Sequence, residues 1–446
     1  MASLFSALTV AVGGLTAQSS ALGNISDNLA NAQTVAYKSI GTQFESLVTQ
    51  SNSSFNNPGG VRATPQYQND VQGNLIQSAT PTSLSITGQG FFAVESATIN
   101  ADGSTSFNGN VAFTRRGDFT LDKSGFLVNG AGFYLTGYTV DTEGNVDTST
   151  TAPIEVSALL NDPVPSSSVS YSANLPSSAD VNFTSNPSTL KIFDALGNTH
   201  DMTFTWTKDA ANNWTLDVVV EGGGGTVSTS SGPVSADFSV SIPFVFNDTT
   251  NIGTVDSITS GSAYTVVDNT SSAVNAAQVQ FDLDFSGIDI QGLQSLTLNF
   301  GAYDTTSGLT QFADTAVTVT SFSQNGLPRG SFTNLSIDQN GFVSLNYNNG
   351  SLKTIAQVPI VQFFAQNQLQ RISGGAYLAT LASGTPRYSA PGTTGAGVIT
   401  SSSLESSNVD IAAQFTDMIQ AQQIYSANSK TITTINNMLN TIINAV

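Results

Sequence analysis

The stretch LTAQSSALGNISDNLANAQTVAYK, residues 15–38, decides how this chain begins to fold. Leucines recur every seven residues through it and just before it, and three further residues fill the second position of the same stripe: Leu8, Leu15, Leu22 and Leu29, with Ala11, Gln18 and Ile25. A seven-residue repeat keeps one stripe of a helix against a partner helix and favours left-handed coiling. The sequence therefore predicts a helix over residues 1–37 that packs along a second helix.

The other end of the chain carries a matching pattern. Two lines of residues recur every seven positions, the second following the first by four: Ile411, Met418, Tyr425, Ile432 and Leu439, then Phe415, Gln422, Ser429, Asn436 and Ile443. This pattern predicts that residues 408–446 form the partner helix. From periodicity alone, an ordinary amphipathic pair lying on the protein's own core is an alternative.

The charge content of the two ends favours a polymer over that alternative. Residues 1–37 hold one charged side chain, Asp27, and residues 408–446 hold Asp410, Asp417 and Lys430. An isolated helix in water normally carries charges on its outer face, so these faces are typical of helices with neighbours on several sides. We expect the pair to be weakly stable in the free chain and ordered by lateral packing. The predicted polymer contacts are Leu8, Leu15, Leu22, Ile25, Leu29, Ile411, Phe415, Met418, Tyr425, Ile432 and Leu439.

Composition excludes several classes of function. Of the 446 residues, 39% are hydrophobic and only 10% are charged, and the net charge is -19. We therefore expect neither nucleic acid nor an anionic membrane surface as a partner, because binding to either requires clustered Lys and Arg. The chain has no cysteine, which excludes disulfides and thiol chemistry. The first basic residue is Lys38, so the chain start lacks the basic segment of a signal peptide. We expect export by another route.

The region between the ends predicts β structure. It is rich in Thr, Val, Phe, Gly and Asn, and four Asp-x-x-Gly turns stand before strand-like residues: 122–125, 141–144, 194–197 and 338–341. In such a turn the Asp side chain caps backbone amides while Gly takes the left-handed conformation. These turns predict hairpins rather than calcium loops. The fold class expected is multi-domain and mainly β, with paired terminal α-helices.

Catalytic and metal-binding groups are scarce. The only histidine, His200, lies beside Asp201 on a predicted turn, where an exposed hairpin residue is a better interpretation than a catalytic base. Asp282, Asp284 and Asp289 could together bind a hard cation, but alternating acidic and apolar residues favour a half-buried strand. A carboxylate pair for glycoside cleavage stays open, because separation in space cannot be read from sequence. We expect no enzyme, no cofactor and no metal.

Both ends carry motifs that resemble those of bacterial flagellar rod and hook proteins. The N-terminal motif is Asn-x-Ala-Asn-x-x-Thr-x-Gly-aromatic-Lys, and this chain departs from it at Ala36. The matching residues are Asn28, Ala30, Asn31, Thr34, Tyr37 and Lys38, followed near the other end by Ser407, Asn408, Val409 and Asp410. Residues 87–92 and 113–130 resemble the family's inner β domain. Residues 190–214 and 326–359 resemble hook proteins in particular.

The resemblance implies a nested layout and a mechanical role. It implies an innermost helical domain (1–37 and 408–446), a linker or extension (38–71), an inner β domain (72–147 and 327–407) and an outer inserted β domain (148–326). It also implies a self-assembling flexible hook tube that passes torque from rod to filament. Partners would be copies of the chain, the distal rod, hook cap and hook–filament junction proteins, and the flagellar export apparatus. The alternatives are a distal rod or junction protein, or a secreted carbohydrate-binding or carbohydrate-active β protein.

Overall fold

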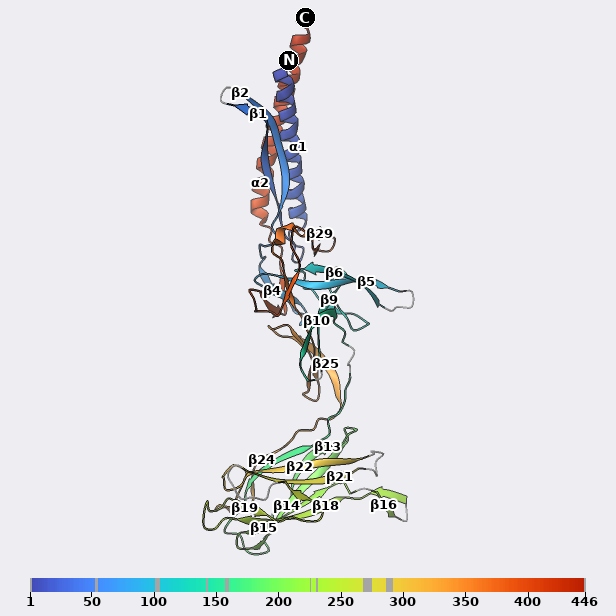
Figure 1. Cartoon of the computed structure of the whole chain (residues 1–446), viewed down its shortest axis with the longest axis vertical. Coiled ribbons are helices and arrows are strands. Elements are labelled where there is room, and N and C mark those ends of the chain that lie inside the picture. The colour runs from blue at the N-terminus through green and yellow to red at the C-terminus, as the bar shows by residue number, and fades with distance from the viewer. Residues whose placement is uncertain are drawn as a thin grey trace. The chain divides into compact units, whose positions relative to one another are not determined.

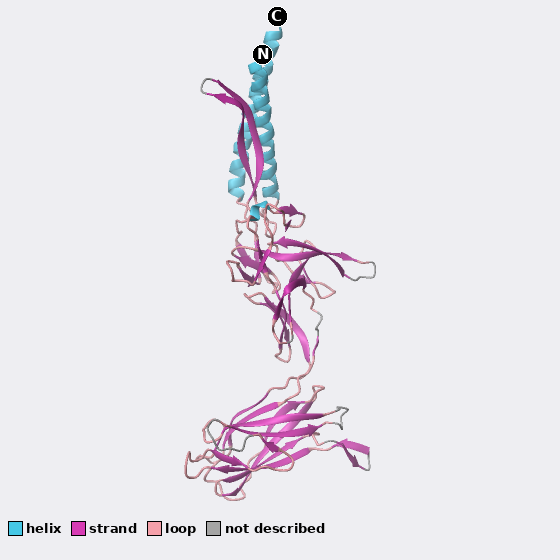
Figure 2. Cartoon of the chain, in the orientation of Figure 1, coloured by secondary structure: helices cyan, strands magenta, loops and turns pink. Residues whose placement is uncertain are grey.

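The structure is a computed structural model that describes residues 2–52, 55–100, 105–141, 143–156, 160–224, 226–229, 232–267, 275–285 and 292–444. It is mainly β, with one long helix at each end of the chain (Figures 1 and 2). The expected fold class is confirmed. The chain divides into two compact units. Unit 1 comprises Met1–Ser157, Asn334–Asn346 and Leu352–Val446, and unit 2 comprises Ala158–Thr333 and Tyr347–Ser351.

The helices α1 (Ala2–Ala30) and α2 (Ile411–Asn444) pack against each other within unit 1 (Figure 1). The contact is close: a Cβ added at Gly14 would lie 2.8 Å from Nδ2 of Asn428. Asp410 caps α2 by accepting hydrogen bonds from the amides of Ala412 (2.9 Å) and Ala413 (3.1 Å). Within the described part of the chain, neither helix is long and apolar enough to cross a membrane.

One line of the predicted seam lies one residue earlier in α2 than the sequence pattern suggested. Ala421 and Ile435 are buried, whereas Gln422, Ser429 and Asn436 are exposed. The second line therefore follows the first by three residues, the other spacing that a heptad allows. The small side chain of Ala421 permits close packing against α1, where Ala11, Ala17, Ala21 and Ile25 are buried.

The remaining seam residues differ in exposure. Leu8, Leu15, Leu22, Leu29, Met418, Ile432 and Leu439 are half-buried. Ile411, Phe415 and Tyr425 keep 46%, 48% and 42% of their surface exposed. Those three side chains are available to other molecules rather than enclosed within one chain.

A long hairpin lies beside α1, where the sequence predicts a linker or extension. Strands β1 (Ile40–Asn52) and β2 (Phe55–Tyr67) pair antiparallel (Figure 1). A Cβ added at Gly13 would lie 3.7 Å from the carbonyl oxygen of Val61, an ordinary van der Waals distance, so β2 packs directly against α1.

The β part of unit 1 is assembled from segments far apart in sequence. β5 pairs with β6, β9 and β28, while β3 pairs with β33 and β4 with β32. An aromatic core forms around Phe91, Phe113, Phe363 and Tyr377. The strands are β3 (Leu75–Gln77), β4 (Leu84–Thr87), β5 (Phe91–Ile99), β6 (Thr105–Thr114), β7 (Thr120–Leu121), β8 (Leu127–Val128), β9 (Phe133–Val140), β10 (Val146–Pro153), β26 (Phe342–Tyr347), β27 (Leu352–Gln357), β28 (Ile360–Gln362), β29 (Gln370–Ile372), β30 (Ala376–Leu378), β31 (Arg387–Ser389), β32 (Val398–Ser401) and β33 (Ser403–Glu405), with the 3-10 turn η2 (Gln366–Gln368).

Unit 2 contains two main sheets, ordered β13-β14-β15-β18-β19 and β20-β21-β22-β12-β23, with β24 paired to β12. Its core includes Trp206, whose Nε1 donates to the Tyr171 hydroxyl at 3.1 Å, and Trp214. The strands are β11 (Leu160–Asn161), β12 (Ser168–Asn174), β13 (Ser188–Phe193), β14 (Thr199–Ala210), β15 (Asn213–Val220), β16 (Thr226–Thr229), β17 (Gly232–Ser235), β18 (Phe238–Phe246), β19 (Val255–Ile258), β20 (Thr265–Val266), β21 (Ala276–Asp284), β22 (Leu293–Ala302), β23 (Leu309–Thr310) and β24 (Thr318–Gln324). β25 (Gly330–Ile337) contains the boundary between the units.

The four Asp-x-x-Gly segments form the predicted turns. In the first, Oδ1 of Asp122 accepts hydrogen bonds from the amides of Ser124 (2.9 Å) and Phe126 (2.8 Å), and Gly125 has φ +87°. The other three turns repeat this geometry, with glycine φ of 81° to 87°. The carboxylates bind backbone amides, which confirms hairpins.

Candidate functional site

The N-terminal motif residues gather where α1 ends, β1 begins and α2 begins. The side chain of Asn28 is buried and hydrogen-bonds both backbone groups of Ile40, each at 2.9 Å. Its Nδ2 also donates to Oε1 of Gln414 on α2 at 2.9 Å. One amide thus connects three elements.

The segment after α1 is a turn closed by other motif residues. Thr34 donates its hydroxyl to Oδ1 of Asn31 at 3.1 Å, while Ala30 is exposed at the end of α1. Ala36 is buried, has φ +56°, and donates its amide to the Glu405 carbonyl at 2.8 Å. A left-handed conformation costs an alanine free energy that glycine avoids. Position 36 is where this chain departs from the family motif.

Replacing Ala36 by glycine is therefore expected to stabilise unit 1 by about 0.5–1 kcal/mol, the relief of strain exceeding the added entropy of the unfolded chain. Replacing Ala36 by valine should destabilise it, because a β-branched residue is strongly disfavoured at positive φ. The measurement is urea unfolding followed by helical circular dichroism, since α1 and α2 both belong to unit 1. Equal stabilities of the glycine and valine variants would contradict this account of the turn.

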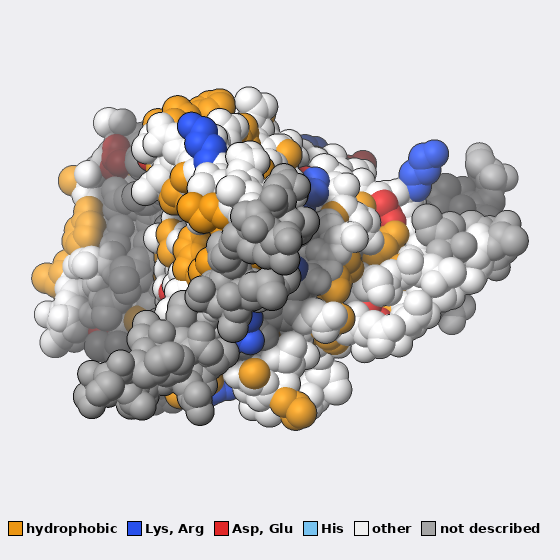
Figure 3. Space-filling view, turned by 90° about the horizontal axis from the view of Figure 1, so that it is seen from above, with side chains coloured by type: hydrophobic (Ala, Val, Ile, Leu, Met, Phe, Trp, Pro, Cys, Tyr) orange, Lys and Arg blue, Asp and Glu red, His pale blue; other side chains and the backbone are white. Residues whose placement is uncertain are grey.

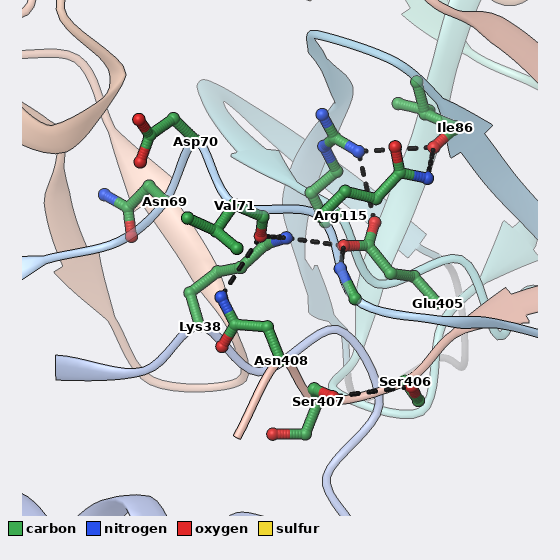
Figure 4. Close-up of polar contacts among 12 residues, drawn as sticks. Lys38, Asn69, Asp70, Val71, Ile86, Arg115, Glu405, Ser406, Ser407 and Asn408 are labelled. Atoms are coloured by element: carbon green, nitrogen blue, oxygen red, sulfur yellow. Dashed lines mark hydrogen bonds and ion pairs between the residues drawn. The ribbon is translucent and has the colours of Figure 1, made fainter. Parts of the chain in front are cut away.

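Directly after the turn, a buried charge cluster joins the two ends of the chain to the β part of unit 1 (Figure 4). The Lys38 ammonium donates to Oε1 of Glu405 at 2.5 Å, and Arg115 Nη1 donates to Oε2 at 3.2 Å. The amide of Gly73 donates to Oε1 at 2.8 Å. Side chains of Lys38, Arg115 and Glu405 are 1%, 1% and 0% exposed. One carboxylate therefore forms ion pairs with two buried cations.

Backbone carbonyls accept further hydrogen bonds from both cations, whereas Nε of Arg115 is buried without a partner. Lys38 donates to the Val71 carbonyl at 2.6 Å, and Arg115 Nη2 donates to the Gly88 carbonyl at 2.6 Å. Burial, the largest influence, lowers the pKa of Lys38 below its ordinary value, although the Glu405 carboxylate raises it. Burial likewise lowers the pKa of Arg115. Desolvation thus outweighs the attraction of Glu405 for each cation.

The C-terminal motif completes the junction. Oδ1 of Asn408 accepts from the amide of Ser39 at 2.7 Å, and its Nδ2 donates to the Val71 carbonyl at 3.1 Å. The Val409 amide donates to the Ser407 hydroxyl at 3.3 Å before Asp410 caps α2. The Arg371 guanidinium lies over the Tyr37 ring, with Cζ of Arg371 4.9 Å from the centre of that ring. The structure thus gathers the motif residues from both ends, except the exposed Ala30.

Arg115 lies in the stretch 113–130 that resembles the inner β domain, but neither Arg115 nor Glu405 was predicted as a site residue. A signal existed for Glu405, because a charged residue between an apolar residue (Leu404) and a small one (Ser406) is conspicuous in a chain with 10% charged residues. Val71 and Gln414 carried no such signal. Their roles depend on contacts that only the folded chain makes.

A groove lies on the same part of unit 1, between α1, α2 and the start of β1. Its volume is about 430 Å³. The lining residues are Gln18, Ala21, Ile25, Ile40, Gly41, Thr42, Phe44, Gln414, Asp417, Gln420, Ala421 and Ile424. Asp417 is the only charged residue among them.

The outer face of α2 exposes large apolar side chains. Ile411, Phe415 and Ile419, between 46% and 56% exposed, follow one another by four residues on this face. Ile424, Tyr425 and Met438 are 40%, 42% and 51% exposed at other positions around the helix, and Ile424 lines the groove. Among the described side chains visible in Figure 3, few are charged. Exposed apolar side chains in this number mark an interaction surface.

His200 and the aspartate group do not form a second site. His200 is buried, not exposed as predicted, because the Asp194–Gly197 turn places Asp194 against it, with Nε2 3.0 Å from Oδ2. Burial, the largest influence, raises the pKa of Asp194, but hydrogen bonds from His200, Asn198 and backbone amides bring it below its ordinary value. Nδ1 of His200 lies 2.9 Å from the Glu221 carbonyl, so both ring nitrogens are engaged.

The proposed cation ligands fall on β21 and beyond it. Burial alternates along β21, as a half-buried strand requires, and Asp282 is exposed. Asp289 lies outside the described residues. Among the residues that the structure does describe, no group of three His, Asp or Glu side chains could hold a metal ion.

Four family models match the chain in order. They are described as flagella basal body rod protein (residues 8–38), flagellar hook protein FlgE/F/G D1 domain (85–172), flagellar basal body protein FlaE D2 domain (163–327) and flagellar basal body rod FlgEFG protein C-terminal (400–445). A solved structure of Helicobacter pylori flagellar hook protein FlgE2 is similar over 73% of this chain and 98% of that chain, at 15% identity and a TM-score of 0.45.

Full-length relatives decide among the members of this group. The flagellar hook protein FlgE of Rhizobium meliloti is 30% identical, with 99% of each chain covered. That of Brucella suis is 29% identical over 99% of each chain, and that of Escherichia coli is 27% identical over 98% of this chain and 99% of its own. These three full-length relatives are all hook proteins. The chain belongs to the flagellar hook protein FlgE family and is a non-enzymatic structural subunit of the flagellar hook.

Proposed function

We propose that copies of this chain contact one another through the outer faces of α1 and α2 and so build a flexible hook tube. The exposed apolar stripe of α2 carries this proposal. Ile411, Phe415 and Ile419 are spaced by four residues and therefore share one side of the helix. Repeated contacts between different surfaces of identical chains generate an open helical assembly. The same faces carry few charges, as expected of surfaces covered by neighbours.

Several finer assignments belong to the same proposal. Residues 1–37 and 408–446 form the innermost domain, 38–71 an extension, 72–147 and 327–407 an inner β domain, and 148–326 an outer inserted domain. The chain leaves the cell through the flagellar export apparatus without a cleaved signal. It meets the distal rod, hook cap and hook–filament junction proteins at the ends of the tube. The resemblance to the family supports these assignments.

Torque transmission requires subunits that keep their own shape while contacts between copies change. Unit 2 has a large core of its own, with Trp206, Trp214 and Phe244 buried. The buried Lys38–Glu405 pair ties the chain ends to the β part of unit 1. Uncharged polar faces can slide past one another without breaking specific ion pairs. Bending would then occur where such uncharged faces of neighbouring copies meet.

Replacing Phe415 by aspartate tests the polymer contact. Burying an unpaired carboxylate costs several kcal/mol, so we expect the concentration needed for assembly to rise about 100-fold or more. The measurement is sedimentation of polymer formed by the purified full-length chain. Helical circular dichroism of the unassembled variant should match the wild type, because Phe415 is half exposed within one chain.

The matched control is Ile252→Asp, which places the same charge at an exposed apolar site of unit 2. We expect this control to assemble at a concentration close to that of the wild type. Normal assembly of the Phe415 variant would refute the proposed role of the α2 outer face.

A further inference from the structure

Asp417 has no ion-pair partner among the residues of its own chain that the structure describes. It lies on α2 and lines the groove between α1, α2 and the start of β1, where every other lining residue is uncharged. Among the described residues, none of the salt bridges of the chain includes Asp417. Its carboxylate therefore faces water in a single chain. A neighbour packed over the groove would remove that water.

Lys430 is the one cation of the two terminal helices. Residues 2–30 contain no Lys or Arg, and Lys430 alone supplies one in residues 411–444. It is exposed and takes part in no salt bridge among the residues described. Its ammonium group would also lose water when neighbours pack around α2.

Helix geometry prevents Asp417 and Lys430 of one chain from meeting. They are 13 residues apart on α2. That spacing places them about 20 Å apart along the axis and, at about 100° per residue, roughly 140° apart around it. Complementary groups on different sides of one subunit are what a contact between successive copies in an open assembly requires.

We propose that Lys430 of one copy enters the groove of a neighbouring copy and pairs with its Asp417. This inference rests on the proposed packing of copies through α1 and α2. The amide oxygens of Gln18, Gln414 and Gln420 can accept the other ammonium protons, and Ile424 offers apolar surface to the lysine stem. Pairing gives each buried charge a partner, whereas leaving either unpaired would oppose assembly.

Asp27 is the alternative partner for Lys430. Like Asp417, it is an exposed carboxylate of the terminal helices that does not cap a helix. Asp27 does not line the groove. Asp410 already caps α2 through two backbone amides. Charge exchange between Lys430 and each of the two free carboxylates separates the possibilities.

The experiment compares Lys430→Glu, Asp417→Lys and their combination in the purified full-length chain. Each single variant places like charges together, so we expect the concentration needed for assembly to rise about tenfold or more. The combined variant restores opposite charges and should assemble within about threefold of the wild type, the spread expected when a pair is reversed rather than removed. The control combines Lys430→Glu with Asp27→Lys, and we expect it to assemble as poorly as Lys430→Glu alone.

Each outcome is decisive when the unassembled variants keep the helical circular dichroism and tryptophan fluorescence of the wild type. Normal assembly of the single variants, lack of rescue by the combined variant, or rescue by Asp27→Lys would overturn the Lys430–Asp417 pair. The Phe415→Asp variant separates this result from the proposed function. If that variant fails to assemble while the charge variants behave normally, the helix contact stands and only the ion pair is refuted.

Discussion

Replacing Glu405 by glutamine is expected to destabilise unit 1 by about 3–5 kcal/mol, the cost of leaving buried charges without their counter-ion. The Glu405 carboxylate is fully buried and accepts hydrogen bonds from Lys38, Arg115 and the amide of Gly73. A glutamine has the same size but no charge. The substitution therefore leaves two buried cations of unit 1 without a counter-ion.

Replacing Lys38 by methionine should cost far less, about 1 kcal/mol, because one buried cation and one buried carboxylate then remain. The pKa of Lys38 is lowered by burial despite Glu405, which indicates that its charge is costly where it lies. Arg115 and Gly73 still donate to Glu405 in this variant. The Val71 carbonyl keeps the hydrogen bond from Asn408.

The two units can be followed separately during unfolding in urea. Both tryptophans, Trp206 and Trp214, belong to unit 2, whereas both long helices belong to unit 1. Tryptophan fluorescence should be unchanged by these substitutions, while helical circular dichroism should shift. Glu45→Gln, which removes an exposed pair with Arg62, is the control and should change stability by less than about 1 kcal/mol. A Glu405→Gln variant as stable as this control would contradict the role of the cluster.

Features that depend on neighbouring residues could be predicted from the sequence. The heptad spacing of Leu8 to Leu29 indicated a paired helix, and each Asp-x-x-Gly turn was predicted because its carboxylate binds amides only two and four residues away. Alternation along β21 was readable for the same reason, since burial there follows a two-residue period. Local periodicity and turn chemistry act within a few residues.

Features that depend on distant residues could not be predicted in this way. Glu405 lies 367 residues from Lys38, and no spacing rule connects them. His200 was predicted to be exposed because it lies on a predicted hairpin turn, yet its ring hydrogen-bonds to Asp194 and packs against Phe285. Burial depends on which strands meet.

The seam on α2 shows an intermediate case. A heptad allows the second apolar line to follow the first by three or four residues, and the sequence offered both. Phe415 follows Ile411 by four residues and favoured that spacing. The buried residues, however, are Ala421 and Ile435, which follow Met418 and Ile432 by three residues. Phe415 therefore lies on the outer surface of α2, where we propose that it contacts other copies.

Replacing Ile25 by aspartate is expected to abolish assembly. Ile25 is buried on α1 and also lines the groove beside Asp417, so the new carboxylate would enter a site that already holds one. Loss of a buried isoleucine costs about 2–5 kcal/mol, and burying an unpaired charge adds several more. Because α1 and α2 pack through this line of residues, we expect the pair to separate.

The readout is the absence of sedimentable polymer and of hooks in electron micrographs of cells that carry only the variant. Tryptophan fluorescence should remain that of the wild type, since Trp206 and Trp214 lie in the separate core of unit 2. Ile25→Leu keeps the volume and the apolar character and should cost less than about 1.5 kcal/mol, with assembly retained. An Ile25→Asp chain that formed normal hooks would show that the α1–α2 seam is dispensable, and the polymer contacts would then have to lie on the β domains instead of the helices.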